Sequence, residues 1–445
     1  MKRNTVFYKD LINIAVPVTL QALLQSSFSV IDQLMIGQIG SNSIAGIGLG
    51  GKFASIFSVV LSAIAAAAGI MIAQYIGKKN NNGLRKSFHI NLLLSLILAV
   101  VFNAVCLLFP GEVMSIYTSD AETCLLASNY LRIFSLSFLP MAATSILSVL
   151  LRCINSAVFP LFASIFSVVL NTSLNYIMIF GKLGLPAMGV NGAAFASVIA
   201  QLAACIVTLI FFVIKIKKEK LSLAFDCKLN KENRKLYAGI ILPILACEFL
   251  WSLGENAYAA IYGNLGTDAC AAITMTNSIQ ALMMGALSGV AQASGIMVGK
   301  LLGSNDYRSA YSDSKRLMKC GIFGSLILSA ALILFGGYYV NIYNVSTSIR
   351  ETAYQILIVF AIISPVKVQN MILSGGIIRS GGKTKYVMWI DIIGTWLFGV
   401  PLGLVSAFVF HLTIPYVYFI LSLEEVVRLL IALVLFKRKN WMNSL

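Results

Sequence analysis

Residues 11–36 read LINIAVPVTLQALLQSSFSVIDQLMI, an apolar run with a single charged side chain, Asp32. A helix needs about 20 apolar residues to cross a bilayer, and this run is longer than that. A carboxylate at the centre of such a helix costs roughly 2.5–3.5 kcal/mol, so it normally faces a bundle interior or a water-filled cavity. The stretch predicts a transmembrane helix whose one acid marks an ion or substrate path.

Similar runs recur along the whole chain. Of the 445 residues, 58% are hydrophobic and 11% are charged, whereas soluble domains have about 45–50% apolar and about 25% charged residues. The runs are continuous rather than alternating, which excludes a membrane β-barrel. The sequence predicts an all-α polytopic membrane protein with twelve transmembrane helices, at 11–36, 47–75, 88–109, 130–151, 158–180, 190–214, 236–262, 272–299, 317–340, 354–378, 386–410 and 414–436.

The net charge of +16 is concentrated at the termini and in every second loop, most densely from Lys215 to Lys235. The alternate loops, such as 264–269 and 411–415, carry no Lys or Arg. This positive-inside pattern predicts a multi-pass protein of the plasma (inner) membrane with both termini in the cytoplasm. It accounts for the basic charge without a nucleic-acid partner. The first run is too long for a signal-peptide core and is expected to stay attached.

Residues that usually form metal sites or catalytic groups are scattered. The eight cysteines occur singly without a CxxC pair, and the chain has only two histidines. We expect no structural metal site, disulfide framework, cofactor or enzyme activity. No GxxxxGK[ST] motif occurs, so ATP is not the expected energy source of a transporter.

The two halves of the chain repeat one another at a constant shift of 226 residues. That shift places Pro17 on Pro243, Gly37 on Gly263 and Gly69 on Gly295, without a gap. The sequence therefore predicts two parallel six-helix repeats, an N-terminal lobe at 1–214 and a C-terminal lobe at 236–445, joined by a basic cytoplasmic linker at 215–235. In transporters built this way the binding site lies between the repeats near the membrane midplane.

Spacings of three and four residues place polar and aromatic side chains on one face of two related helices. In the first span this face holds Gln21, Gln25, Phe28 and Asp32; in the seventh it holds Glu248, Trp251, Glu255, Tyr258 and Tyr262. Each half thus offers carboxylates to a common interior. In the alternative interpretation the acids pair with buried cations such as Lys367 and only hold helices together.

Several motifs together resemble the multidrug and toxic compound extrusion (MATE) family over nearly the whole chain. They are VIDQLMIGQIG at 30–40, IFGKLGLPAMGVNGAAFAS at 179–197, MVGKLLGSND at 297–306 and RSGGKTK at 379–385. The resemblance implies a V-shaped pair of six-helix lobes that lies in the lipid bilayer and exports small cationic, amphiphilic compounds out of the cell in exchange for Na⁺ or H⁺. We expect a monomer.

The resemblance also implies roles for single residues. Asp32 matches the family's cation-coupling carboxylate in the first span, and Asn171 matches a polar partner in that site. The chain departs from one branch at Asn175, where that branch has an Asp. Another branch has an acid at the position of Trp251; Glu255, one turn away, is our preferred substitute, with Glu248 as the alternative. Transient Na⁺ binding is expected at Asp32 or Glu255.

Coupling needs a group that changes its protonation or binds Na⁺ in only one conformation. Lys367 is a candidate switch partner for Glu255 or Asp391. Cargo cations are attracted by aromatic faces and acids, so the cavity is expected to include Gln25, Phe28, Trp251, Tyr258, Tyr262, Met283 and Met284. Ordinary helix packing or lipid contact is the alternative for each.

Three functional classes remain open. The first is an ion-coupled multidrug exporter. The second is a flippase for a lipid-linked saccharide from the same wider superfamily, which would favour extra spans and a strongly cationic cavity. The third is a membrane enzyme or a sensor, for which the sequence offers neither a catalytic constellation nor a soluble domain.

Overall fold

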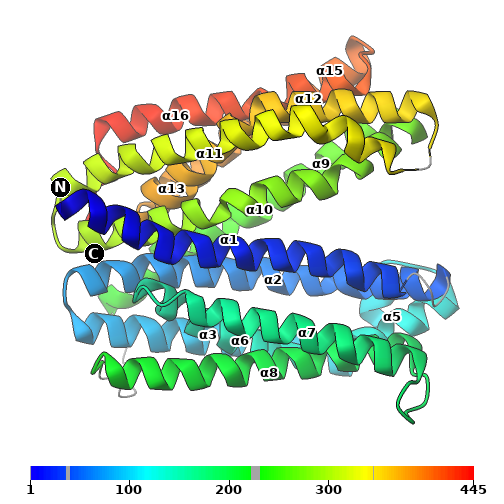
Figure 1. Cartoon of the computed structure of the whole chain (residues 1–445), viewed down its shortest axis with the longest axis horizontal. Helices are drawn as coiled ribbons and strands as arrows, with labels where there is room; N and C mark the ends of the chain where they lie inside the picture. The colour runs from blue at the N-terminus through cyan, green and yellow to red at the C-terminus, as the bar shows by residue number, and fades with distance from the viewer. Residues whose placement is uncertain (1, 37–40, 222–230, 344) are drawn as a thin grey trace. The chain divides into compact units, whose positions relative to one another are not determined.

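The computed structural model describes residues 2–36, 41–221, 231–343 and 345–445, with side chains at 2–4, 27–34, 36, 41–42 and 231–233 outside the description. Over these ranges the regular secondary structure is entirely helical (Figure 1). The predicted fold class, an all-α polytopic membrane protein, is confirmed.

The first half of the chain forms α1 (Lys2–Ile36), α2 (Ser41–Gly77), α3 (Asn81–Leu108), α4 (Pro110–Ser115), α5 (Ala121–Phe134), the 3₁₀ turn η1 (Ser135–Ser137), α6 (Phe138–Cys153), α7 (Val158–Phe180) and α8 (Gly189–Lys218). The second half forms α9 (Lys231–Gly263), α10 (Thr267–Gly303), α11 (Tyr307–Asn341), α12 (Thr347–Asn370), α13 (Thr384–Ile392), α14 (Val400–Leu404), α15 (Ile414–Ser422) and α16 (Glu424–Arg438). Three π-helical segments continue these helices: η2 (Met371–Ile378), η3 (Ile393–Gly399) and η4 (Val405–Val409).

Ten helical stretches in the part of the chain that the structure describes are long and apolar enough to cross a membrane: Ser43–Gly77, Asn81–Leu108, Ala121–Cys153, Val158–Phe180, Gly189–Lys218, Arg234–Gly263, Thr267–Gly303, Tyr307–Asn341, Thr347–Ile378 and Thr384–Val409. The predicted first span lies in α1. The predicted last span is divided at Leu423 into α15 and α16, each too short to count alone. With these two, the helices agree with the twelve-span prediction.

Polar side chains begin several of these helices at the expected positions. Asn80, Asp120 and Asp306 each accept a hydrogen bond from a backbone N–H in the first turn of α3, α5 and α11, which satisfies one of the groups that a helix start leaves unpaired. Gly181 ends α7 with φ +66°, a left-handed conformation that suits glycine.

The chain folds into two compact units. Unit 1 contains Met1–Thr19, Ala73–Lys79 and Asn230–Leu445, and unit 2 contains Leu20–Ile72 and Asn80–Leu229. Helices α1 and α2 therefore each contribute to both units. These units follow spatial contacts, whereas the predicted lobes follow the sequence repeat. The limits 1–214 and 236–445, with the linker at 215–235, remain a prediction.

The end of α2 and the end of α10 approach closely within unit 1. A Cβ atom added to Gly77 would meet the backbone carbonyl of Lys300, and one added to Gly303 would meet the carbonyl of Gln74. Two glycines thus allow the helix backbones to touch directly, a contact that any larger residue would prevent.

Each unit has its own apolar core. In unit 1, Ile356, Leu357 and Phe360 of α12 are buried against residues of α9, α10, α11 and α15. In unit 2, Phe57 of α2 stacks on Phe138 of α6, with ring centres 4.3 Å apart. The core of unit 1 supports the polar cavity described next.

Candidate functional site

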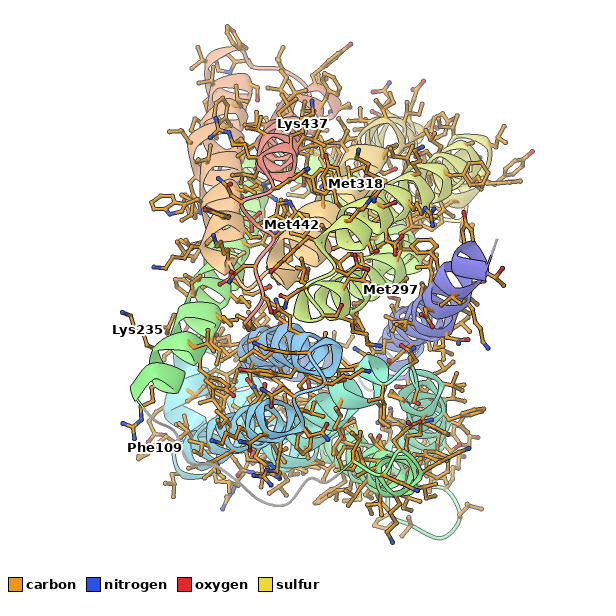
Figure 2. All side chains as sticks on the ribbon, turned by 90° about the vertical axis from the view of Figure 1, so that its left-hand side faces the viewer. Phe109, Lys235, Met297, Met318, Lys437 and Met442 are labelled. Atoms are coloured by element: carbon orange, nitrogen blue, oxygen red, sulfur yellow. The ribbon has the colours of Figure 1, made fainter. Side chains whose placement is uncertain are left out.

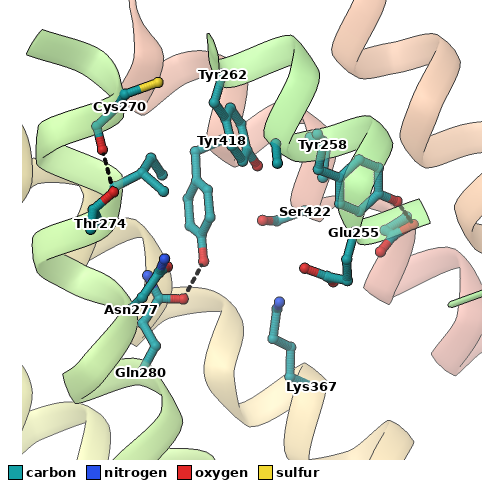
Figure 3. Close-up of a pocket in the computed structure, with 14 residues that line it drawn as sticks. Glu255, Tyr258, Tyr262, Cys270, Thr274, Asn277, Gln280, Lys367, Tyr418 and Ser422 are labelled. Carbon is teal, nitrogen blue, oxygen red and sulfur yellow. Dashed lines mark hydrogen bonds between the residues drawn. The ribbon is translucent and has the colours of Figure 1, made fainter. Parts of the chain in front are cut away.

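A cavity of about 260 Å³ lies in unit 1, among α9, α10, α12, α15 and α16 (Figure 3). Its lining is mostly polar, unlike the surrounding core. The polar and aromatic members are Glu255, Tyr258, Tyr262, Cys270, Thr274, Asn277, Gln280, Lys367, Tyr418, Ser422 and Glu424; Ala259, Ile273 and Leu421 complete it.

Helical spacing explains why α9 and α10 face the cavity with polar side chains. Glu255, Tyr258 and Tyr262 recur at intervals of three and four along α9, and Thr274 and Asn277 do so along α10. Residues at such intervals share one face of an α-helix. The sequence prediction for the stripe on the seventh span therefore describes a real face of α9, part of which lines the cavity.

Glu255 and Lys367 extend into the cavity toward one another (Figure 3). Lys367 also has an acidic partner behind it, because its Nζ lies 3.8 Å from Oε1 of Glu425. Among the described residues, Glu255 makes neither a hydrogen bond nor an ion pair. Its carboxylate is therefore available to a ligand.

Two tyrosines are fixed by hydrogen bonds at the wall. Tyr258 donates to Oε2 of Glu424, and Gly399 backs this bond closely enough that a Cβ there would meet both oxygens. Tyr418 donates to Oε1 of Gln280 over 2.8 Å. Because their hydroxyl groups are held, the rings of these two tyrosines are positioned before any ligand arrives.

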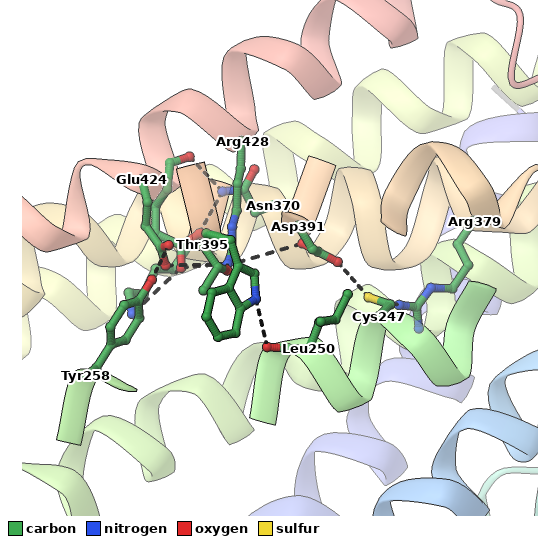
Figure 4. A network of polar contacts seen from close by, with 12 residues as sticks. Cys247, Leu250, Tyr258, Asn370, Arg379, Asp391, Thr395, Glu424 and Arg428 are labelled. Atoms are coloured by element: carbon green, nitrogen blue, oxygen red, sulfur yellow. Dashed lines mark hydrogen bonds and ion pairs between the residues drawn. The ribbon is translucent and has the colours of Figure 1, made fainter. Parts of the chain in front are cut away.

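Arg428 of α16 lies behind the cavity and contacts acids from two helices (Figure 4). Its guanidinium nitrogens are 3.4 Å from Oε1 of Glu424, 3.9 Å from Oε1 of Glu425 and 3.8 Å from Oδ1 of Asp391. The same group donates to the hydroxyl of Thr395 in η3. A buried guanidinium needs such partners, since an unpaired charge in a membrane interior is costly.

The polar network continues from Asp391 to α9. The thiol of Cys247 donates to Oδ2 of Asp391 over 2.7 Å (Figure 4). Nη1 of Arg379 lies 3.5 Å from Oε1 of Glu248. Asn370 donates to the side chain and to the backbone carbonyl of Glu425, both at 2.8 Å. Polar groups from α9, α12, α13 and α16 are thus linked across the interior of unit 1.

The acids of the cavity and its backing outnumber the cations. Among the described residues there are two cations, Lys367 and Arg428, and four acids: Glu255, Glu424, Glu425 and Asp391. An excess of carboxylates in a desolvated place favours a bound cation or protons. The cavity is thus electrostatically suited to a positively charged species.

The candidates in the first half of the chain lie in unit 2. Asn175 donates to Oδ1 of Asn171 over 2.8 Å, and Asn171 donates to the hydroxyl of Ser197 over 3.3 Å. Asp32 and Phe28 belong to α1, but their side chains are outside the described residues. Gln25 is an exposed residue of the same helix.

Of the residues predicted from sequence, the cavity brings together Glu255, Tyr258, Tyr262 and Lys367. The remaining predictions in unit 1 do not line it. Trp251, one turn before Glu255 on α9, is 46% exposed and lies outside the lining. Met283 is buried in the apolar core, with Met284 packed against that core. Glu248 and Asp391 have arginine partners instead.

Sequence reasoning did not identify Tyr418, Gln280 and Asn277 as cavity residues. Nothing in their local pattern distinguishes them from packing residues. The cluster of Glu424, Glu425 and Arg428 did carry a signal, because acids three and four residues before an arginine pair with it on a helix. The structure shows both pairs.

A family model described as MatE matches the chain at residues 17–177 and 243–405, one match in each half. Curated relatives include the "Uncharacterized transporter YisQ" of Bacillus subtilis, 23% identical over 88% of this chain and 86% of that protein. The "Probable multidrug resistance protein NorM" of Thermotoga maritima is 23% identical over 91% of this chain and 86% of that one.

Solved structures show the same fold. A mutant of the Vibrio cholerae MATE transporter VcmN superposes with a TM-score of 0.89 at 16% identity and covers 99% of this chain and 100% of its own. A transporter of the MOP superfamily from Pyrococcus furiosus gives 0.86 at 18% identity, over 97% and 95% of the two chains. With the family model matched in both halves, the chain belongs to the MatE family, that is, to the multidrug and toxic compound extrusion family, whose members are membrane transporters and not enzymes.

Proposed function

We propose that this transporter is a secondary active multidrug exporter, which moves small cationic, amphiphilic compounds out of the cell in exchange for Na⁺ or H⁺. Several curated relatives are named probable multidrug resistance proteins. Their names support an efflux function, and the cavity in unit 1 supports a positively charged cargo.

The observation that carries this proposal is the carboxylate of Glu255 in a cavity walled by Tyr258, Tyr262 and Tyr418. Aromatic faces attract organic cations, and a nearby carboxylate fixes the charged centre. Lys367 lies opposite Glu255 in the cavity, so the carboxylate faces a positive group of the protein as well as the cargo (Figure 3). A cargo cation that approaches Glu255 would weaken its interaction with Lys367.

Coupling is proposed to use the same competition. A proton or Na⁺ on Glu255 lowers the affinity for a cargo cation, so ion entry on one side favours cargo release there. In unit 2 we propose a second cation site at Asp32, assisted by Asn171 and Asn175. The linked amides of Asn171 and Asn175 support this assignment, because they form a fixed pair of polar groups at a buried position.

The cellular setting is part of the proposal. Alternation of basic loops with loops that lack Lys and Arg favours the plasma membrane with both termini in the cytoplasm. In that orientation the exporter carries its cargo away from the cytoplasm. Each chain has its own cavity from five helices of one unit, which supports a working monomer.

The test is efflux of a fluorescent organic cation from proteoliposomes, driven by a pH gradient alone or by a Na⁺ gradient alone. We expect one gradient to drive efflux and Glu255→Gln to reduce it roughly tenfold to a hundredfold, since hydrogen bonds to charged groups contribute about 1.5–3 kcal/mol. Asp32→Asn is expected to abolish coupled efflux. Glu351→Gln, which removes an exposed acid from the start of α12, is the matched control and should transport as the wild type does.

The flippase alternative makes a different prediction in the same vesicles. If neither gradient moves any organic cation while a lipid-linked saccharide crosses the bilayer, the exporter proposal is wrong. The cavity does not favour this outcome, because a pyrophosphate carrier needs several cations and Lys367 is the one cation among the described residues of the lining.

A further inference from the structure

A second cavity of unit 1 lies where α11 begins and where the chain leaves α16. It has a volume of about 470 Å³ and is lined by Tyr307, Arg308, Tyr311, Lys439 and Met442. In Figure 2, Lys437 marks the end of α16 and Met442 lies in the tail that follows. None of these residues belongs to the polar cavity described above.

Two lysines gather over one ring of this cavity. Nζ of Lys315 lies 4.4 Å from the centre of the Tyr311 ring, and Nζ of Lys439 lies 4.9 Å from the same centre. The two ammonium groups are therefore within about one Debye length, ~10 Å, of each other and repel one another. An anion placed between them would relieve this repulsion.

Carboxylates near this cavity are already engaged elsewhere. Asp306 accepts a hydrogen bond from the Ser309 N–H as the cap of α11, and Asp313 pairs with Arg316 at 3.7 Å. Within the described residues, Arg308, Lys315 and Lys439 have no acidic partner. Two cations of the lining, Arg308 and Lys439, and a third beside the shared Tyr311 ring, Lys315, thus have no counter-charge from the described residues.

The aromatic wall of the cavity is rigidly built. Tyr311 stacks on Phe436 with ring centres 4.8 Å apart, and Phe436 stacks on the fully buried Trp441 at 5.7 Å. The indole N–H of Trp441 donates to the carbonyl of Phe436. Because this stack joins α11 to the tail, the Tyr311 ring that the two lysines share is positioned without a ligand.

The face of α11 that carries Lys315 becomes apolar and exposed farther along the helix. Ile322 and Leu326 follow Lys315 by seven and eleven residues, close to two and three helical turns, so they lie on its side of the helix. They are 42% and 53% exposed, in a helix that is long and apolar enough to span the membrane. A ligand with a charged head at Lys315 and an apolar chain along Ile322 would match this stripe.

We propose that this cavity binds the phosphate headgroup of an anionic phospholipid, in the leaflet that borders the start of α11. Clustered lysines and arginines at a membrane boundary attract anionic lipids, and an intramembrane pocket adds shape to that attraction. A basic helix end alone would serve only to orient the chain in the membrane. Three features distinguish these cations from the basic residues at other helix ends. They border a cavity, two of them contact the same tyrosine ring, and they have no acidic partner among the described residues. The proposal is independent of what the protein exports.

Native mass spectrometry of the full-length protein with phosphatidylglycerol or phosphatidylcholine tests the proposal. We expect phosphatidylglycerol to be retained in preference, and the double variant Lys315→Gln/Lys439→Gln to bind it roughly tenfold or more weakly. The matched control is Lys383→Gln/Lys385→Gln, which removes two exposed lysines of unit 1 outside the cavity. It should bind as the wild type does.

Two further arms keep the outcome decisive. The charge-preserving variant Lys315→Arg/Lys439→Arg should retain binding, which separates loss of charge from loss of folding. Millimolar glycerol phosphate should not displace the lipid; displacement would mean that the site takes a free phosphate and would overturn the lipid assignment. Equal binding of phosphatidylglycerol by the site double variant and the control would also overturn the proposal.

Discussion

Lys367 of α12 and Glu425 of α16 form an ion pair with Nζ 3.8 Å from Oε1, and Lys367 reaches the cavity while Glu425 is buried behind it. Glu425 keeps the Asn370 amide and the Arg428 guanidinium as further partners. The pair therefore connects the ligand cavity to the interior network of unit 1.

Replacing Lys367 by Gln should lower the unfolding free energy by about 1–3 kcal/mol, the cost of removing one charged partner from a buried group that keeps others. A drop in the apparent melting temperature in detergent would measure it. Lys385→Gln, on the exposed start of α13, should leave the melting temperature unchanged. Equal stability of the two variants would show that Lys367 contributes nothing to the fold.

Arg428→Met should be more damaging, by about 3–5 kcal/mol, because it leaves Asp391, Glu424 and Glu425 without their shared cation. Combining Arg428→Met with Asp391→Asn removes one of the uncompensated charges and should recover part of the lost stability. A double-mutant cycle measures the coupling, expected at about 0.5–3 kcal/mol. Purely additive effects would contradict a direct interaction between Arg428 and Asp391.

Gly77→Ala should separate α2 from α10 at their ends, because the new Cβ would meet the Lys300 carbonyl. Overpacking of this kind costs about 1–3 kcal/mol. The control lies in the same helix: a Cβ at Gly51 meets nothing within 4 Å, so Gly51→Ala should be neutral or slightly stabilising. Thermal unfolding in detergent compares the two, and an equally tolerated Gly77→Ala would argue against the close backbone contact.

Asp120 gives a pH-dependent contribution outside the membrane. Hydrogen bonds from Thr123 at the start of α5 lower the pKa of Asp120 below its ordinary value of 3.8. A carboxyl with a lowered folded-state pKa stabilises the protein above pH 3.8 and loses this effect as the pH falls through its folded-state pKa. Asp120→Ala should therefore lower the melting temperature at pH 7 and match the wild type near pH 2–3. A difference that persists unchanged in acid would rule out the ionised cap.

The helices were predictable because a bilayer leaves a spanning backbone few alternatives. Long apolar runs placed nearly every span, yet the break at Leu423 was not visible, since Leu423 and Glu424 are both good helix formers. Spacing along one helix likewise predicts neighbours only on that helix. The i,i+4 spacing is enough to pair Glu424 with Arg428, whereas Asp391 reaches Arg428 from another helix, which no local pattern encodes.

The cavity shows the same limit. Glu255, Tyr258 and Tyr262 were found because they share a face of α9. Tyr418 was not, because its ring enters from α15, and the predicted liner Met283 packs into the core instead. Lys367 of α12 pairs with Glu425 of α16, which is far from it in the sequence. Only the folded structure shows which of the available acids becomes its partner.

The composition of unit 1 has a consequence for biosynthesis. Gln74, a buried residue of α2, donates to the carbonyl of Asn443, and the two are 369 positions apart. At 5–20 residues per second, a ribosome needs roughly 20–70 s to make the intervening chain. Throughout that time the end of α2 has been inserted but lacks its final partners, so its polar groups must be held by water or by insertion chaperones. Unit 1 can therefore be completed only late in synthesis, because its first helices need contacts with residues near the end of the chain.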